Sequence, residues 1–438
     1  MTETKRLTQT EITAFFFPLL LNVQMMSVSH SIINAGLARM HDAVTVLAAF
    51  SVAMVLHLFV ASPSYQNHTV TIAMVRGRRS LLGTVFFVGL VALWVSLLLG
   101  LIAFTPLGTF VLIDLLGVTP VVAKGAREAL ALLVFLPFIT GPRGLFQGLV
   151  IQARRTGLVS FATGIRILSL FAFLWLGYLW FDGTRVAAFA LLCCVFTETV
   201  VIGFFAWKVR LPATDAPENS AKDILRYAFP LAYSSGLQQT VPLLINAMIS
   251  RLPDGTMALA AFGVIRGFLF MLAGPMRNLQ QAYLTLVRDP LDYPALVRFF
   301  YKVSLGMAII MLAVAWPANH WVLGQVMGLD DAMRSYITWP MTACALFPLF
   351  YGAANLFRGW FAGAHLTAKL GRSTVYKVLF LCAFWPCLGY LPQNISGVAI
   401  AIFLLLAAEL CEAWYLRSQR SQLIDDNGLV PVRPLNVK

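Results

Sequence analysis

Charged side chains interrupt several long apolar stretches of this sequence, and they are its most promising chemical groups. A base and an acid recur at one spacing: Arg166 lies 32 residues before Glu198, and Lys377 lies 32 residues before Glu409. An ionisable group at the centre of a bilayer costs about 2.5–3.5 kcal/mol or more, so it needs a partner or a role. The spacing predicts two structural ion pairs, because breaking a buried pair is costly. The alternative is a proton relay.

Five further polar groups in apolar stretches do not recur in the internal repeat described below. They are Arg143, Arg266, Arg358, His30 and His57. Guanidinium groups bind carboxylates and phosphates, so this set predicts a binding site for an anion. The alternatives are that Arg358 extends to the membrane surface and that the histidines are core residues.

Neutral side chains extend the set of candidate substrate-binding residues. They are Gln147, Gln238, Gln239, Asn34, Asn246 and Asn355. Asn34 and Asn246 do recur in the repeat, which favours hydrogen bonding between helices for these two.

The composition explains why these groups are unusual. Hydrophobic residues make up 59% of the 438 residues, charged residues only 12%, and the mean hydropathy is +0.79. A soluble domain is about a quarter charged, so this chain predicts an all-α integral membrane protein. The net charge of +13 does not indicate nucleic-acid binding, because the Lys and Arg residues lie mostly in short loops. The first residues show no cleavable signal peptide, and the six cysteines have no metal-ligand spacing.

Twelve apolar stretches are long enough, or nearly so, to span a bilayer. They cover residues 12–36, 43–65, 81–104, 128–150, 157–180, 185–208, 224–250, 257–275, 299–323, 335–357, 373–392 and 396–416. We interpret residues 104–120 as a loop helix. With the amino terminus inside, the inner segments hold 21 Lys and Arg residues and the outer loops hold 6. Both termini are therefore predicted to be cytoplasmic.

The chain repeats itself after about 212 residues. Phe17-Pro18-Leu19 aligns with Phe229-Pro230-Leu231, and residues 17–52 match 229–264 at 13 of 36 positions without a gap. A shift of 211 residues aligns the later stretches, including Arg166 with Lys377 and Glu198 with Glu409. The repeat predicts a six-helix bundle over 1–210, a cytoplasmic linker over 211–223, a second bundle over 224–418 and a cytoplasmic tail over 419–438.

Six spans in each half make the two halves parallel repeats, related by a pseudo-two-fold axis along the membrane normal. Transporters of that design bind substrate between the halves, near the midplane. Prolines in or near the spans are candidate hinges for alternating access, or they shape the helices statically. They are Pro18, Pro137, Pro230, Pro275 and Pro348.

No phosphate-binding loop and no catalytic motif is present in the sequence. We therefore expect a transporter and not an enzyme, with no cofactor and no metal.

The residues resemble a known superfamily. Two six-helix halves, the Phe-Pro-Leu opening of the first helix and GLFQGLVIQARRTG at 144–157 are similar to the multidrug/oligosaccharidyl-lipid/polysaccharide (MOP) exporters, which include the multidrug and toxic compound extrusion (MATE) transporters. The closer likeness is to the progressive ankylosis protein (ANK) branch. It rests on Pro18-Leu19, Asn34-Ala35-Gly36, Asp42-Ala43-Val44, Leu47-Ala48 and residues 59–75.

The resemblance implies two bundles that export solute by rocking and, for the ankylosis branch, small anions such as pyrophosphate, citrate or nucleotides. The sequence departs from it in having His30 where we expect an acid, and no carboxylate in the first or seventh helix. This leaves the coupling ion open.

We therefore expect a secondary transporter that exports a small anion, acting as a monomer in a bacterial inner membrane. The alternatives are a MATE-type exporter of cationic drugs and a flippase for an anionic lipid-linked precursor.

Overall fold

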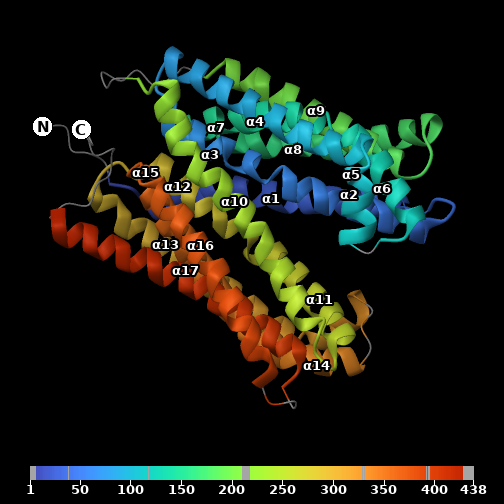
Figure 1. Ribbon diagram of the computed structural model, residues 1–438. Helices are drawn as coiled ribbons and strands as arrows, with labels where there is room; N and C mark the ends of the chain where they lie inside the picture. Colours follow the sequence, from blue (N-terminus) through green and yellow to red (C-terminus); the bar gives the residue numbers. More distant parts are fainter. Residues whose placement is uncertain are drawn as a thin grey trace, which may run out of the picture. The chain divides into compact units, whose positions relative to one another are not determined.

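The computed structural model describes residues 6–37, 39–116, 118–209, 218–327, 329, 331–390, 392 and 395–427, and these residues are almost entirely helical (Figure 1). Within these ranges the structure has no β-strand. The all-α fold predicted from the sequence is confirmed. The chain divides into two compact units: an N unit of Phe17–Gly236, and a C unit of Met1–Phe16 with Leu237–Lys438.

The N unit holds the first set of elements. These are α1 (Gln9–Leu37, from Phe17 on), α2 (Ala43–Val60), η1 (Ser62–Gln66), α3 (Asn67–Met74), α4 (Arg78–Phe104), α5 (Leu107–Thr109), the π-helical η2 (Phe110–Leu115), α6 (Pro120–Leu133), α7 (Leu136–Gln152), α8 (Thr156–Trp180), α9 (Thr184–Trp207) and α10 (Ala221–Ile249, up to Gly236). Small residues on α6 and α9, among them Ala126, Ala129, Ala187 and Ala190, are fully buried in its apolar core. They allow the two helices to approach closely.

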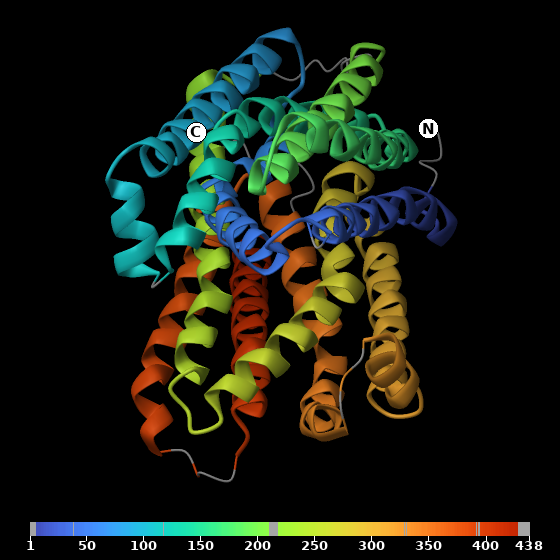
Figure 2. The ribbon, with the colours of Figure 1, turned by 90° about the vertical axis from the view of Figure 1, so that its right-hand side faces the viewer.

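The C unit holds the remaining elements, several of which run roughly side by side (Figures 1 and 2). After α10 these are α11 (Gly255–Ala273), η3 (Gly274–Arg277), α12 (Asn278–Leu286), η4 (Pro290–Asp292), α13 (Tyr293–Ala315), the π-helical η5 (His320–Val326), α14 (Asp331–Ala343), η6 (Cys344–Leu346), α15 (Phe347–Gly363), α16 (Thr367–Phe384), η7 (Trp385–Tyr390) and α17 (Gly397–Asn427). The first turns of α1 pack here, since the Leu7 amide donates to Asp292 at 3.1 Å and Gln9 donates to the Ala295 carbonyl at 2.7 Å.

The internal repeat is visible in the helix boundaries. Helix α10 begins and ends 212 residues after α1, and α15 begins and ends 211 residues after α7. A π-helical segment lies between the third and fourth spans of each repeat, η2 in one and η5 in the other. The compact units nevertheless exchange helix ends, since Met1–Phe16 belongs to the C unit and the part of α10 before Leu237 belongs to the N unit. Of the linker expected at 211–223, residues 211–217 lie outside the described ranges, and of the tail only residues up to 427 are described.

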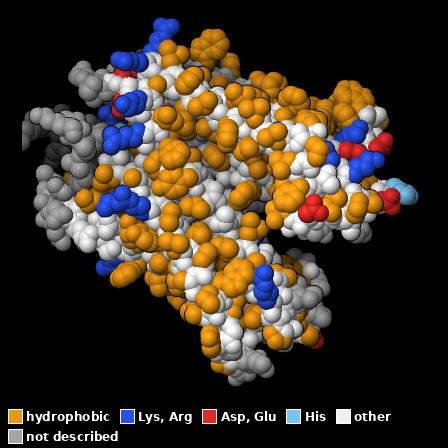
Figure 3. All heavy atoms as spheres, in the orientation of Figure 1, with side chains coloured by type: hydrophobic (Ala, Val, Ile, Leu, Met, Phe, Trp, Pro, Cys, Tyr) orange, Lys and Arg blue, Asp and Glu red, His pale blue; other side chains and the backbone are white. Residues whose placement is uncertain are grey.

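Eight of the described helical segments are long and apolar enough to cross a membrane, or ten if each of two bent pairs counts as one span. Two further long helices, α10 and α16, are more polar. Helix α16 carries Lys369, Arg372 and Lys377, and α10 carries Gln238, Gln239 and two serines. With them the described chain has the twelve spans expected from the sequence. Hydrophobic side chains cover much of the face seen in Figure 3, as a surface in contact with lipid requires.

Two spans continue into short polar helices that lie outside the stretches predicted from the sequence. The second span bends by 59° and continues through η1 and α3, and the eighth continues through η3 into α12. The stretches predicted from the sequence end at 65 and 275, and the segments that follow them, such as Gln66-Asn67 and Asn278–Gln281, are polar. Glycines of α7 and α15 allow the polar helices α3 and α12 to pack closely against them. A Cβ at Gly148 would lie 2.6 Å from Thr71 Cβ of α3, and a Cβ at Gly359 would lie 2.7 Å from Tyr283 Cβ of α12. The ninth span was predicted too long, since α13 ends at Ala315, before Pro317.

The candidate hinge prolines occupy different kinds of position. Pro137 lies in the first turn of α7 at the 49° bend between α6 and α7, Pro348 lies in the first turn of α15, and Pro275 lies in η3. Pro18 lies inside α1 and Pro230 inside α10. Three of the five therefore stand at helix breaks, where a proline costs no intrahelical hydrogen bond. Their role as hinges stays a prediction.

Asp254 joins three helices of the C unit outside the membrane-spanning segments. It precedes α11, accepts a hydrogen bond from the Gly397 amide at 2.8 Å at the start of α17, and accepts another from the Tyr336 hydroxyl of α14. A Cβ at residue 397 would meet Asp254 Oδ1 at 2.8 Å, so Gly397 is required for this approach. Burial raises the pKa of Asp254, but the hydrogen bonds from Tyr336 and Gly397 outweigh it and lower the pKa below 3.8.

We expect Asp254→Asn to lower the thermal midpoint by roughly 2–4 °C, because it removes the charge from two hydrogen bonds. A carboxyl with a lowered pKa contributes stability above its ordinary value of 3.8 and loses it as the pH falls through the folded-state value. The difference between wild type and variant should therefore shrink on acidification below pH 4. Asp42→Asn is the matched control, since Asp42 aligns with Asp254 but its side chain is exposed. Equal effects of the two substitutions would contradict this assignment.

Candidate functional site

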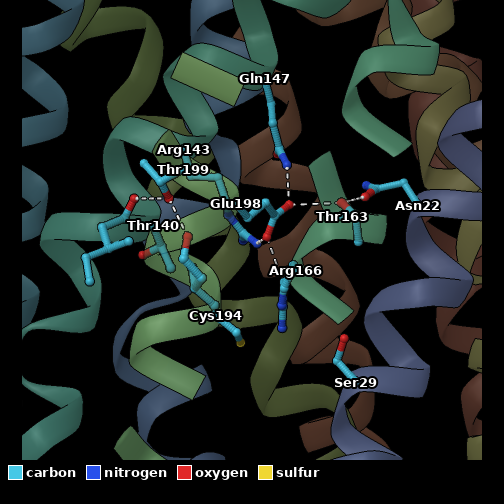
Figure 4. Close-up of polar contacts among 12 residues, drawn as sticks. Asn22, Ser29, Thr140, Arg143, Gln147, Thr163, Arg166, Cys194, Glu198 and Thr199 are labelled. Atoms are coloured by element: carbon cyan, nitrogen blue, oxygen red, sulfur yellow. Dashed lines mark hydrogen bonds and ion pairs between the residues drawn. The ribbon is translucent and has the colours of Figure 1, made fainter. Parts of the chain in front are cut away.

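A buried ion cluster lies at the centre of the N unit, where α7, α8 and α9 pack together. Glu198 of α9 is fully buried. Its Oε2 lies 2.9 Å from Arg143 Nη1 and 3.3 Å from Arg166 Nη1. Figure 4 shows both arginines pointing toward this carboxylate. We call Arg143, Arg166 and Glu198 the N-unit cluster.

Neutral side chains complete the coordination of the second carboxylate oxygen. Glu198 Oε1 accepts a hydrogen bond from Gln147 Nε2 at 3.2 Å and from the Thr163 hydroxyl at 3.0 Å. Thr163 also lies 2.5 Å from Asn22 Oδ1 of α1, so the cluster connects four helices (Figure 4). A carboxylate with this many donors is held in one position.

The N-unit cluster carries more positive than negative charge. Two guanidinium groups share one carboxylate, which leaves a net charge of about +1 when all three are ionised. The Nε atoms of both arginines are buried and have no hydrogen-bond acceptor in the described part of the chain. Arg143 is the more accessible of the two, with 14% of its side chain exposed against 2% for Arg166. The cluster therefore has unused donors and an unbalanced charge, which suit an anion.

The corresponding place in the C unit holds a balanced cluster. Lys377 Nζ lies 2.5 Å from Glu409 Oε1 and 3.0 Å from Glu412 Oε2. Arg358 also pairs with Glu412, with Nε 2.7 Å from Oε1, and donates to Thr374 at 2.8 Å. Two bases meet two acids, all buried, and we call these four residues the C-unit cluster. Gln238, with its amide oxygen toward Arg358, accepts from it at 2.6 and 3.0 Å.

The repeat explains the difference between the two clusters. Arg166 and Glu198 align with Lys377 and Glu409, so this pair is common to both units. The C unit adds Arg358 and Glu412 together, where the N unit has Gln147 and Val201. The N unit adds Arg143 alone, where the C unit has Ala354. The extra base is thus compensated in one unit and not in the other.

The sequence assigned no acid to Arg143 or Arg358, the two arginines without a counterpart in the repeat. In the structure Glu198 contacts Arg143 and Glu412 contacts Arg358. Glu412 was missed altogether. The available signal was its position three residues after Glu409, which places both acids on one face of a helix.

Arg266 of α11 is a separate positive group in the C unit. Its Cζ lies 5.4 Å from the centre of the Phe270 ring. Over the described ranges no hydrogen bond or ion pair is made by this side chain, which is only partly buried. A cation–π contact does not neutralise the charge, so Arg266 keeps its capacity to bind an anion.

The structure places the remaining candidates outside both clusters. His57 of α2 is buried, and its Nδ1 has no partner in the described part of the chain. His30 of α1 is half-buried and lies within electrostatic range of Arg166. Asn355 is buried and donates to the Tyr351 carbonyl at 2.8 Å. Gln239 and Asn246 are half-buried, whereas Asn34 is exposed.

No group of three or more potential metal ligands occurs among the residues that the structure describes.

The fold is that of known transporters. A MOP superfamily transporter from Pyrococcus furiosus, whose binding pocket is described as having reverse polarity, has a TM-score of 0.71 at 16% identity, over 95% of this chain and 96% of that chain. A mutant form of the Vibrio cholerae MATE transporter VcmN has a TM-score of 0.71 at 15% identity, over 96% of this chain and 97% of that chain. The eukaryotic MATE transporter AtDTX14 has a TM-score of 0.69 at 14% identity, over 94% of each chain. At such identities the likeness shows the fold alone.

The family is shown by a separate match. Residues 2–258, more than half of the chain, match the progressive ankylosis protein (ANKH) family. The resemblance found in the sequence is thereby confirmed. The chain is a multi-pass membrane transporter with a MATE-like fold, and it belongs to the progressive ankylosis protein family.

Proposed function

We propose that this protein is a secondary active transporter that exports a small organic or phosphate-bearing anion, such as citrate, pyrophosphate or a nucleotide, by alternating access. The observation that carries the proposal is the charge of the N-unit cluster, in which Arg143 and Arg166 share one carboxylate. In a medium of low dielectric constant, an uncompensated positive charge attracts anions and repels cations strongly. The partial exposure of Arg143 gives a solute a point of access to that charge.

Arg266 supports the same proposal from the C unit. Its guanidinium has an aromatic neighbour and no acid in the described ranges. A transporter of cationic drugs would require acids at such positions, but the acids Glu409 and Glu412 are neutralised by Lys377 and Arg358. The charges therefore favour an anion over a cation.

The membrane orientation is also a proposal. The distribution of Lys and Arg puts both termini in the cytoplasm. Residues close to the two described ends of the chain both contact the start of α13: the Leu7 amide donates to Asp292, and Arg420 Cζ lies 4.5 Å from the centre of the Tyr293 ring. Ends that lie together agree with an even number of spans. We propose a bacterial inner membrane and a monomer.

Uptake into proteoliposomes tests the proposal. Labelled citrate, pyrophosphate and ATP are compared with a cationic dye, with and without a pH or sodium gradient. Flux of at least one anion without dye flux is the expected result. Dye flux without anion flux would mean that the protein exports cations, and flux of neither solute with scrambling of an anionic lipid would mean that it is a flippase.

We expect Arg266→Ala to reduce anion uptake by a factor of about 10–100, because a hydrogen bond to a charged group contributes about 1.5–3 kcal/mol. Arg251→Ala is the matched control. Arg251 also stacks on an aromatic ring, with Cζ 4.7 Å from the centre of Trp385, but it is exposed and lies outside the apolar spans. A similar loss in both variants would show that the loss reflects the aromatic contact and not anion binding.

A further inference from the structure

The charge of the N-unit cluster determines how many negative charges it balances by itself. With both arginines and Glu198 ionised the cluster carries about +1. A monoanion brings it to zero. A dianion would leave one negative charge in a buried site, and an uncompensated buried charge is costly. Protonation of Glu198 removes that excess.

We propose that Glu198 takes up one proton when the N-unit cluster binds a dianion, and takes up none when the cluster binds a monoanion. This inference rests on the proposed function, since it requires an anion at Arg143 and Arg166. The proton comes from the protonated buffer in solution, whose bond to it breaks as an O–H bond forms on a carboxylate oxygen of Glu198, and no other covalent bond changes. Protonation releases both guanidinium groups from Glu198 and leaves them to the dianion.

The partners of Glu198 Oε1 allow a neutral carboxyl group. A protonated carboxyl is a hydrogen-bond donor and needs an acceptor. Gln147 and Thr163, which contact Oε1 at 3.2 and 3.0 Å, can both accept as well as donate, by turning the amide or rotating the hydroxyl. A proton on Oε1 can therefore be donated to Gln147 or Thr163 without any rearrangement of the helices.

The C-unit cluster differs in its charge. It is already balanced, with two bases and two acids. Glu409 contacts Lys377, which can only donate, whereas Glu412 also contacts the Ser373 hydroxyl at 3.4 Å. The C-unit cluster therefore has no excess positive charge with which to bind an anion.

The titratable groups beside Glu198 are Arg143 on α7, Arg166 on α8 and Cys194 on α9, and His30 of α1 lies near Arg166. The other two helices packed on α9 also carry titratable groups: His57 on α2, and Lys124, Arg127 and Glu128 on α6. Glu128 pairs with Arg185 at the first turn of α9, away from Glu198. His30 and His57 are thus the alternative proton acceptors, and the test must separate them from Glu198.

Isothermal titration of the full chain in detergent, in two cationic buffers with different heats of protonation, measures the protons taken up on binding. Sulfate and methanesulfonate are the probes, because both are tetrahedral, they differ by one charge, and neither titrates between pH 5 and 9. We expect about one proton per sulfate and about none per methanesulfonate. The affinity for sulfate should fall about tenfold for each unit of rising pH, since one proton is bound with it.

Two variants locate the proton. Glu198→Gln imitates the protonated carboxyl, so it should bind sulfate without proton uptake and independently of pH. Glu128→Gln changes a partly exposed acid of the same unit that pairs with Arg185, away from Glu198, and should keep the uptake. The inference is overturned if sulfate binds the wild type without proton uptake, or if the uptake persists in Glu198→Gln, which would assign it to a histidine, His30 or His57. If neither sulfate nor methanesulfonate binds the folded wild-type protein, the proposed function itself fails, and this inference fails with it.

Discussion

Arg143→Ala is expected to reduce anion uptake into proteoliposomes by a factor of about 10–100, from the loss of roughly 1.5–3 kcal/mol of charged hydrogen bonding. The substitution removes the base that makes the N-unit cluster positive. Glu198 keeps Arg166, which lies 3.3 Å away, so the remaining pair is balanced and binds anions weakly. The scaffold should tolerate the change, because the aligned residue of the C unit is Ala354. The thermal midpoint should therefore move little.

Two controls accompany this variant. Arg143→Lys keeps the charge but loses the fork of donors and should retain part of the uptake. Arg185→Ala removes another arginine of the N unit, half-exposed and paired with Glu128, and should transport like the wild type. Full uptake by Arg143→Ala would contradict the role given to the N-unit cluster.

Glu412→Val is expected to destabilise the fold by about 3–5 kcal/mol, the cost of breaking a buried ion pair. The variant leaves Arg358 and Lys377, both buried, with Glu409 as the one acid of the C-unit cluster, and Glu409 pairs with Lys377. We expect a drop of several degrees in the thermal midpoint measured in detergent.

The internal repeat suggests a second substitution that should restore part of the stability lost in Glu412→Val. The residues of the N unit that align with Arg358 and Glu412 are Gln147 and Val201. The double variant Arg358→Gln with Glu412→Val should therefore be more stable than Glu412→Val alone, since Lys377 and Glu409 remain paired. A double variant less stable than the single one would show that Arg358 is held chiefly by Thr374 and Gln238 and not by its charge partner.

The fold was largely predictable because a membrane imposes length and hydropathy on each span. Helices α1, α8 and α9 begin within three residues of the predicted stretches. Helices α3 and α12 were not predicted, since their Asn, Gln and Thr residues indicate a loop by composition. They are buried because glycines of α7 and α15 leave room for them, which a single stretch of sequence does not reveal.

The site could be predicted only where the internal repeat indicated the relative depth of two residues in the membrane. The equal spacing of Arg166–Glu198 and Lys377–Glu409 placed each base at the depth of its acid, and the structure has the two pairs at 3.3 and 2.5 Å. Arg143 and Arg358 have no counterpart in the other repeat, so nothing in the sequence indicated which acid they would contact. Their partners depend on the rotation of α7 and α15 about their axes, which is determined by packing.

Charge reversal at residue 143 tests the central claim most directly. In Arg143→Glu the cluster holds one base and two acids, so its net charge becomes about −1. The measurement is the ratio of labelled pyrophosphate uptake to cationic dye uptake in proteoliposomes, for wild type and for a variant shown to be folded by its thermal midpoint. If the N-unit cluster selects the substrate, the wild type should give a ratio well above that of protein-free liposomes. The ratio for the variant should fall to about the value of protein-free liposomes. A variant that takes up pyrophosphate as well as the wild type would show that the charge of this cluster does not select the substrate.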